Sequence, residues 1–397
     1  MTGRRADKAR AWAELLRVSA LLSVPGDALA GAAAAGARPG RGTLHAIGAS
    51  LCLYEAGMAL NDWADRTEDA AERPHRPLPS GRITPGAALT ASVALTATGL
   101  GLAARAGRPT LAVATALATT VWAYDLGLKH TPAGPATMAT ARALDLLLGA
   151  TASTHGRTEP GRTTATGTAT GTGTVTGSSG TATRPGPATG SGTVTATSTA
   201  TRSAPTALRA LPSAVLLGAH AYAVTAVSRH ETQGGSTRTP LAALAVTLAV
   251  AGAASGAISG ATSGVTTRAA SGATIGATTG AMAGRRSGTA ATSSPSGGPA
   301  PAPRPRPARP SRGRPHPSRR LGPLLALAYA RTPATLLLHA ALNPSAALTE
   351  RAVGGGIRAT IPLQAALAAR AGVPGTALAL LGLVPAARAL ARKVNPT

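Results

Sequence analysis

An acidic segment in the first fifth of the chain holds the residues whose types and spacing best suit chemistry. It reads Asn61-Asp62-Trp63-Ala64-Asp65-Arg66-Thr67-Glu68-Asp69. The chain has only 14 acidic residues, and five of them lie between positions 62 and 72. Because Asp62, Asp65 and Asp69 are spaced i, i+3, i+7, a helix would place their carboxylates along one face. Hard oxygen ligands at this density suit Mg²⁺, which often joins carboxylates to substrate phosphates. The alternative is a helix that merely ends in a polar loop.

A basic, proline-rich stretch follows the acidic segment directly. It contains Arg73, Arg76 and Arg82, and guanidinium groups can hold a phosphate through two parallel hydrogen bonds. Carboxylates for a metal followed by arginines for phosphate predict a diphosphate site, to which Asn61 adds a neutral oxygen or an amide donor. The arginines also fit the excess of basic residues in cytoplasmic loops of membrane proteins, and both interpretations can hold together.

Long apolar segments must position these residues. Segments of about 17–25 residues, the length that crosses a bilayer, lie near 17–38, 44–62, 86–105, 109–127, 134–153, 208–228, 240–259 and 321–342. Residues 356–392 hold either one tilted span or two short spans split at Gly372-Val373-Pro374-Gly375. Only 13% of the residues are charged, against about 25% in a soluble domain. The expected fold is therefore an all-α transmembrane bundle of nine or ten spans, rather than a soluble protein with buried helices.

Two low-complexity stretches interrupt the apolar segments. Residues 154–206 are nearly all Thr, Gly, Ser and Ala, and residues 260–320 end in a Pro/Arg-rich run. Neither stretch can bury enough apolar surface to offset its ordering entropy, so both are expected to be disordered insertions. They divide the bundle into residues 1–153, 207–259 and 321–397. We interpret the Pro/Arg run as a solvated insertion and expect no nucleic-acid partner, despite the net charge of +25.

The acidic segment and the loop after it resemble the first aspartate-rich motif of the UbiA-type membrane prenyltransferases. The match reads Asn61-Asp62-x-x-Asp65-x-x-x-Asp69, followed by Arg76-Pro77-Leu78-Pro79-Ser80-Gly81. The segment Tyr124-Asp125-Leu126-Gly127-Leu128-Lys129 is similar to the end of the family's fourth helix, and residues 142–150 resemble its fifth. The resemblance covers about 11–260 and 321–397. Residues 51–58, with the second motif described below, resemble the divergent EboC-like branch.

The resemblance implies an enzyme that uses Mg²⁺ to ionise an allylic diphosphate, so that an acceptor captures the prenyl cation. Asp62, Asp65 and Asp69 would bind the metal and, with Lys129, form the catalytic group. The diphosphate would be held by Asn61, Arg73 and Arg76. Asp125, four residues before Lys129, would orient that lysine or pair with it structurally.

The family's second aspartate motif is altered in this chain. At the end of the sixth expected helix the sequence reads Ser228-Arg229-His230-Glu231, without an aspartate. From the resemblance we expect Glu231 to ligate a second Mg²⁺ and Arg229 to hold the diphosphate directly.

Other ionisable residues lie inside or beside the spans. Arg142 and Asp145 are spaced i, i+3 in an apolar segment, where unpaired charges are unfavourable. They are expected to form a structural ion pair, or one of them faces an acceptor pocket. Arg17 and Asp27 flank the start of the first span, and Asp27 after Pro25-Gly26 is typical of a helix cap, with acceptor contact as the alternative.

Taken together, these features predict a multi-pass protein of the plasma membrane with its active site on the cytoplasmic face. It would transfer a prenyl group from an isoprenoid diphosphate to an aromatic or lipid-like acceptor within the membrane. The alternatives are a prenyl-diphosphate cyclase or synthase of the same fold, and a non-catalytic component that binds or transports isoprenoid lipids.

Overall fold

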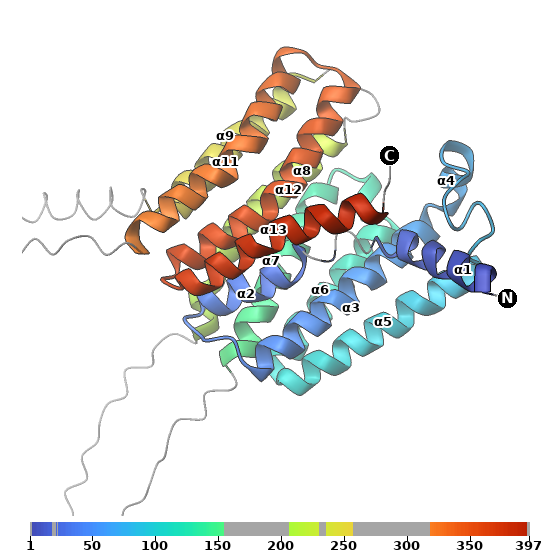
Figure 1. Cartoon of the computed structure of the whole chain (residues 1–397), viewed down its shortest axis with the longest axis horizontal. Helices are drawn as coiled ribbons and strands as arrows, with labels where there is room; N and C mark the ends of the chain where they lie inside the picture. The colour runs from blue at the N-terminus through green and yellow to red at the C-terminus, as the bar shows by residue number, and fades with distance from the viewer. Residues whose placement is uncertain are drawn as a thin grey trace, which may run out of the picture.

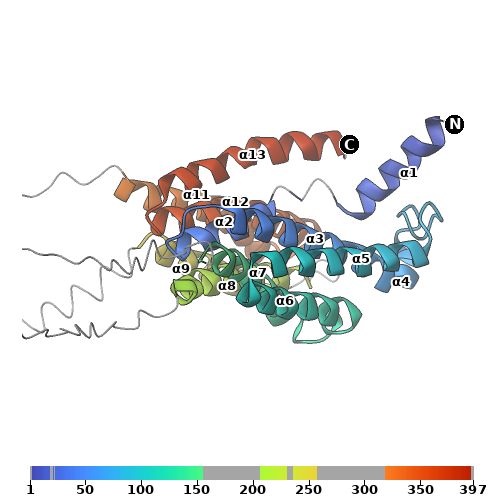
Figure 2. The ribbon, with the colours of Figure 1, turned by 90° about the horizontal axis from the view of Figure 1, so that it is seen from below.

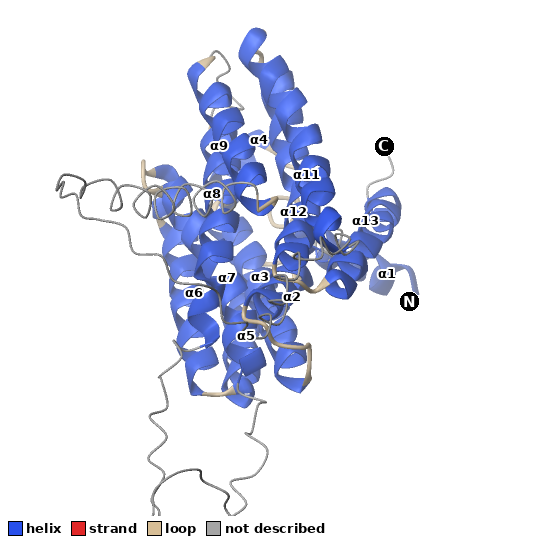
Figure 3. Cartoon of the chain, turned by 90° about the vertical axis from the view of Figure 1, so that its left-hand side faces the viewer, coloured by secondary structure: helices blue, strands red, loops and turns tan. Residues whose placement is uncertain are grey.

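The computed structural model describes residues 2–17, 21, 23–154, 206–229, 236–256 and 318–394. Regular structure in these ranges is entirely helical, with no strand (Figure 3), which confirms the predicted all-α class. The two predicted insertions, 154–206 and 260–320, lie outside the described residues except at their edges. Their predicted disorder therefore stays a prediction.

The first part of the chain forms α1 (Thr2–Leu15), α2 (Pro25–Ala34), α3 (Arg41–Ala64), α4 (Arg66–Glu72), α5 (Pro85–Ala106), α6 (Arg108–Leu126), the 3-10 helix η2 (Leu128–His130) and α7 (Gly134–Thr154). The second part forms the 3-10 helix η3 (Thr206–Ala210), α8 (Leu211–Ser228), α9 (Arg238–Ala254), α11 (Ser318–Leu342), α12 (Ala346–Arg370) and α13 (Pro374–Val394). The long helices coincide closely with the apolar segments seen in the sequence.

The helices pack as two neighbouring groups (Figure 1). In one group α3 packs against α5, α6 and α7; in the other α8, α9, α11 and α12 pack together. The pairs α7–α8 and α2–α12 join the two groups. Figure 2 shows that α1 and α13 lie on the same side of the layer formed by the other helices. Because α2 packs against both α7 and α12, it lies between the two groups.

The predicted span 17–38 is wrong in its extent. Pro25 begins α2, because proline lacks the N–H that a helix interior requires, and Gly36 follows the helix with a φ of +70°. The resulting 10-residue helix is about 15 Å long, half the thickness of a bilayer core. At the other end, where one span or two were left open, the structure has two helices divided at residues 372–375, since α12 ends at Arg370 and α13 begins at Pro374.

Three of the described helices are long and apolar enough to cross a membrane: Pro85–Ala106, Ala207–Ser228 and Leu321–Leu342. Such helices make the chain an integral membrane protein. The predicted total of nine or ten spans stays a prediction.

Small residues allow α2 and α7 to approach closely. Gly149 of α7 lies against the backbone of Ala28 in α2, and Gly31 of α2 lies against the backbone carbonyl of Leu146. A side chain at either glycine would overlap backbone atoms, which cannot move away as a flexible side chain can. This contact matters for the site because α2 and α7 carry Asp27, Arg142 and Asp145.

Gly149→Ala is therefore expected to destabilise the protein by about 1–3 kcal/mol through overpacking. The measurement is the thermal unfolding midpoint of the purified protein in detergent. Gly101→Ala is the matched control, because a Cβ at that position meets no atom within 4 Å. Equal midpoints for the two variants would show that the α2–α7 contact relaxes without loss.

Candidate active site

The acidic segment forms the junction between α3 and α4. Asp62 belongs to the last turn of α3, Asp65 joins the two helices, and Asp69 lies in α4. The helical turn continues through the junction, since Asp65 N–H donates to the Asn61 carbonyl at 2.9 Å and Asp69 N–H to the Asp65 carbonyl at 2.8 Å. Asp62 and Asp69 are buried, so these charges require partners.

The basic loop folds back onto the acidic segment. Arg76 Nη1 lies 2.7 Å from Asp69 Oδ2 and 3.6 Å from Asp62 Oδ1. Arg73 Nη1 lies 3.8 Å from Asp69 Oδ1. One guanidinium thus joins the two carboxylates spaced i, i+7. Arg73 and Arg76, predicted from sequence to hold diphosphate, are therefore beside the acids.

Lys129 brings a second charged loop to the same place. Its Nζ lies 2.5 Å from Asp65 Oδ1, and His130 Nε2 lies 3.9 Å from the same oxygen. Lys129 has its ion pair with Asp65 rather than with Asp125, whose Oδ1 accepts a hydrogen bond from Asn61 Nδ2 at 3.2 Å. The reason is that α6 ends at Leu126 and Lys129 lies in η2, so the two residues do not have the i, i+4 spacing of one continuous helix.

Arg229 adds the third loop. It follows α8 and donates a hydrogen bond to the backbone carbonyl of Thr131, two positions after Lys129. The predicted metal ligand Glu231 and the neighbouring His230 lie outside the described residues. The described part of the chain thus brings together three loops that the sequence separates widely.

Arg82 has a structural role that sequence reasoning missed. Its Nη1 lies 2.7 Å from Glu14 Oε2 of α1, and its Nη2 donates to the carbonyl of His75 at 2.6 Å. A small apolar cluster supports this contact, with Leu15 of α1 packed among Leu78 and Ile83 of the basic loop. The suggested phosphate contact by Arg82 is therefore not supported by its position; it ties the loop to α1 instead.

Arg17 is a site residue to which sequence reasoning assigned no role. Its Nη2 lies 3.6 Å from Asp62 Oδ1. Its backbone has a φ of 48°, a left-handed conformation that is uncommon for residues other than glycine. The signal in the sequence was an arginine at the start of the first apolar segment.

The oxygen atoms of the acidic segment suit a hard cation. Asp62 Oδ1 is buried and has no hydrogen-bond partner in the described part of the chain. Among the described residues, Asp65, Glu68 and His130 have ligand atoms that all lie within 4.8 Å of one another; Glu68 and His130 were not predicted as ligands. Carboxylate oxygens are the ligands that Mg²⁺ prefers, so the residues present fit the predicted metal.

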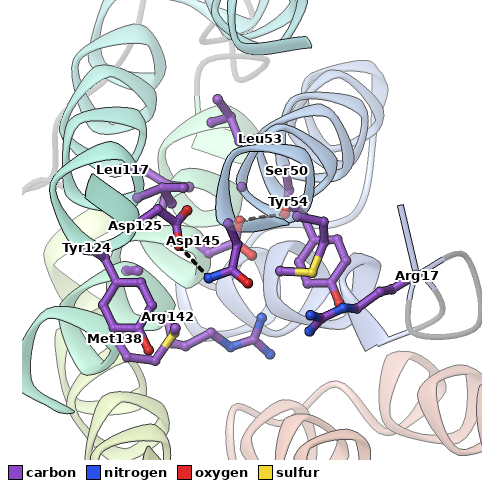
Figure 4. Close-up of a pocket in the computed structure, with 15 residues that line it drawn as sticks. Arg17, Ser50, Leu53, Tyr54, Leu117, Tyr124, Asp125, Met138, Arg142 and Asp145 are labelled. Atoms are coloured by element: carbon purple, nitrogen blue, oxygen red, sulfur yellow. Dashed lines mark hydrogen bonds between the residues drawn. The ribbon is translucent and has the colours of Figure 1, made fainter. Parts of the chain in front are cut away.

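A cavity of about 310 Å³ lies inside the bundle beside this charged cluster (Figure 4). At the charged end it is lined by Arg17, Asn61 and Asp125, and Arg17 also contacts Asp62. Its walls are largely apolar, and include Leu53, Met58, Leu117, Val121 and Met138. Ser50, Arg142 and Asp145 line it at the other end.

The long axis of the cavity follows α3. Ser50 and Asn61 both line it and are eleven positions apart, which corresponds to about 16 Å of α-helix. At the deeper end Arg142 Nη1 pairs with Asp27 Oδ2 at 2.9 Å, and Asp145 Oδ1 accepts from Ser50 Oγ at 2.6 Å. Arg142 therefore takes its ion pair from α2 rather than from Asp145, and Asp27, predicted as a helix cap, makes no such cap.

Comparison with known proteins gives a family and several relatives. The model of the UbiA prenyltransferase family matches residues 24–283. A digeranylgeranylglyceryl phosphate synthase of Methanopyrus kandleri is 35% identical over 124 residues, which are 31% of this chain and 45% of that protein. The synthase of the same name from Methanothrix thermoacetophila is 43% identical over 84 residues, 21% of this chain and 32% of its own length. The chain thus spans less than half the length of these curated relatives.

The apo structure of a UbiA homologue from Aeropyrum pernix K1 aligns with a TM-score of 0.46 and 15% identity, over 91% of this chain and 96% of that one. The family match is the stronger result, because it covers more than half of the chain and contains the acidic segment, the basic loop and Lys129. The chain therefore belongs to the UbiA prenyltransferase family.

Proposed function

We propose that the chain transfers a prenyl group from an isoprenoid diphosphate to an acceptor within the membrane. The observation that carries this proposal is the position of the charged cluster at one end of a mostly apolar cavity. A prenyl diphosphate likewise has a charged part and an apolar part, namely a polyanionic head and a hydrocarbon chain. The head fits the charged loops, and the allylic end of the chain fits the apolar walls next to them.

The charged end supplies groups for each part of the leaving diphosphate. Asp62, Asp65 and Asp69 would hold Mg²⁺, which when bound stabilises the negative charge that develops on the departing oxygen. Arg76 and Lys129 already lie against these acids and would donate hydrogen bonds to phosphate oxygens.

Further cations stand at the edge of this cluster. Arg73 and Arg229 are more exposed and would bind the outer phosphate. Asn61 is held by Asp125 and would present its amide oxygen toward the metal. We also propose Glu231 as a further ligand, as the resemblance implies.

The apolar walls protect the reacting carbon. Leu53, Leu117 and Val121 offer no nucleophile, and a water-poor cavity prevents the allylic cation from being captured by water. The bond between the allylic carbon and the diphosphate oxygen would break with its electron pair on that oxygen. An acceptor in the same cavity would then form the new bond to the carbon and lose a proton, which the released diphosphate can take up. The names of the relatives favour a lipid-like acceptor over an aromatic one.

We place the reaction at the cytoplasmic face of the plasma membrane. The loop between α3 and α5 contains Arg66, Arg73, Arg76 and Arg82, and short basic loops favour the cytoplasmic side. Partners are then the prenyl diphosphate, the acceptor and membrane lipid.

The test is a product analysis. Purified protein is incubated with Mg²⁺, a panel of prenyl diphosphates and a native lipid extract, and products are identified by mass spectrometry. A prenylated lipid that forms only with both substrates supports transfer. A cyclised hydrocarbon formed without extract would indicate a cyclase, and bound prenyl lipid without diphosphate release would indicate a binding protein.

A further inference from the structure

The deeper end of the cavity is charged, although it lies well inside the bundle. Arg142 and Asp145 line it one helical turn apart on α7, and Ser50 of α3 lines it beside Asp145, to which it is hydrogen-bonded (Figure 4). Charged side chains at membrane depth are unfavourable and are retained mainly where they serve a substrate pathway or site. The charged groups at this end of the cavity therefore suit the binding of a polar ligand.

An ion pair with a buried carboxylate fixes the position of the Arg142 guanidinium. Asp27, which is fully buried, lies 2.9 Å from Arg142 Nη1 through its Oδ2. Its other oxygen, Oδ1, accepts a hydrogen bond from Gln364 Nε2 at 2.6 Å, and the same nitrogen donates to the Ser23 carbonyl at 2.9 Å. Three helices, α2, α7 and α12, thus position one cation at the cavity wall.

Asp145 is positioned in the same way. It is buried, and its Oδ1 accepts a hydrogen bond from Ser50 Oγ at 2.6 Å. Because Ser50 and Asp145 come from different helices, their bond fixes the carboxyl group relative to both cavity walls. The result is a donor, Arg142, and an acceptor, Asp145, one helical turn apart on α7 and both in the lining of the same cavity.

The prenyl chain of the donor cannot be the ligand of this end. Hydrocarbon placed against Arg142 and Asp145 would exclude solvent from polar groups and give no hydrogen bond in return. The acceptor is the other molecule that the proposed function requires, and it must reach into the cavity to meet the allylic carbon.

We propose that Arg142, Asp145 and Ser50 form an acceptor subsite that binds an uncharged hydroxyl group. This inference rests on the proposed function for its assignment to the acceptor. A hydroxyl can donate to a carboxyl oxygen and accept from a guanidinium at once. A carboxylate or phosphate would face the carboxyl groups of Asp27 and Asp145, and an ammonium group would face Arg142 and has no lone pair to accept from it.

This hydroxyl is a recognition group and is distinct from the atom that is prenylated. Ser50 lies about 16 Å along α3 from Asn61 at the charged end, whereas the reacting carbon is bonded to the diphosphate. The acceptor is therefore an extended, largely apolar molecule with a nucleophile near one end and a hydroxyl near the other.

The test uses four ten-carbon probes that differ only in the polar group: 1-decanol, decane, decanoate and decylamine. Binding to the full-length protein in lipid nanodiscs is measured by native mass spectrometry, with empty nanodiscs as the reference. We expect the protein to bind 1-decanol about tenfold more tightly than the other three, as hydrogen bonds to charged groups would provide. Equal binding of all four probes would overturn the proposal.

Two variants locate the binding. Ser50→Ala and Asp145→Asn are each expected to reduce the binding of 1-decanol to that of decane. Ser92→Ala is the matched control. The hydroxyl of Ser92 is buried and donates to the carbonyl of Ala56 on the neighbouring helix α3, but Ser92 does not line the cavity. If Asp145→Asn fails to fold, Ser50→Ala alone decides, since it removes one hydroxyl. A preference for 1-decanol that survives in Ser50→Ala contradicts the subsite.

The same samples separate this inference from the proposed function. Asp65→Ala is expected to lose diphosphate release and to keep the preference for 1-decanol. Wild-type protein that selects 1-decanol but releases no diphosphate would contradict the proposed transfer and leave the hydroxyl subsite supported. Protein that releases diphosphate but binds the four probes equally would contradict the hydroxyl subsite and leave the proposed transfer supported.

Discussion

Asp65→Ala is expected to lower Mg²⁺-dependent release of diphosphate from a prenyl diphosphate by roughly 1,000-fold. Asp65 is the point where the acidic segment meets Lys129, whose Nζ lies 2.5 Å away. Its removal would take away a proposed metal ligand and the anchor of a phosphate-binding cation together. Electrostatic groups of this kind are each worth about 100- to 1,000-fold in rate. A colorimetric assay of released diphosphate, with and without EDTA, measures the effect.

Glu72→Ala is the control for this change. Glu72 ends α4 only a few residues away and is exposed, so its loss removes the same net charge from the loop. We expect its turnover to stay within about twofold of wild type, as for most exposed substitutions. Unchanged turnover in Asp65→Ala would remove Asp65 from the metal site. Slow turnover in both variants would assign the effect to the net charge of the loop.

Lys129→Met is expected to reduce kcat/KM for the prenyl diphosphate by roughly 100-fold, or about 2.7 kcal/mol. The change removes a charge-assisted hydrogen-bond donor of the diphosphate while it keeps the length and apolar stem of the side chain. A second effect has the opposite sign. Because the ammonium no longer competes for Asp65, the apparent affinity for Mg²⁺ should rise in the absence of substrate. Steady-state kinetics and Mg²⁺ titrations measure the two effects separately.

Two further variants complete this experiment. Lys129→Arg retains the positive charge and should recover part of the activity, although the planar guanidinium does not reproduce a compact ammonium. Lys8→Met removes an exposed lysine of α1 and should leave both measurements unchanged. If Lys129→Met binds Mg²⁺ more tightly but turns over normally, Lys129 is only an ion-pair partner of Asp65.

Much of the fold followed from local patterns. Apolar runs of membrane length predicted nearly every long helix, because helix formation depends on residues within a few turns. The same locality explains why Asp62, Asp69 and Arg76 lie together, since they are within 15 positions and meet through one helical junction and one loop. Local pattern failed at the first span, where the apolar composition was continuous but Pro25 and Gly36 limited the helix to α2.

The partners of the buried charges were decided by tertiary structure. Lys129 and Asp65 are 64 positions apart, Ser50 and Asp145 are 95 apart, and Gln364 and Asp27 are 337 apart. Sequence spacing suggested Asp125 for Lys129 and Arg142 for Asp145, since neighbours along one helix are the partners that a pattern can reveal. Packing of different helices placed better partners closer, and no periodicity records which helix faces become neighbours.

The sequence by itself thus determined that this is a helical membrane protein with an acidic motif at the end of a helix. Helix packing alone decided that the motif opens beside an apolar cavity with Arg142 and Asp145 at its far end. The physical reason is that residue type and helical period depend on near neighbours along the chain. A cavity, by contrast, is formed by side chains from several helices, and its shape and polarity exist only once those helices are packed.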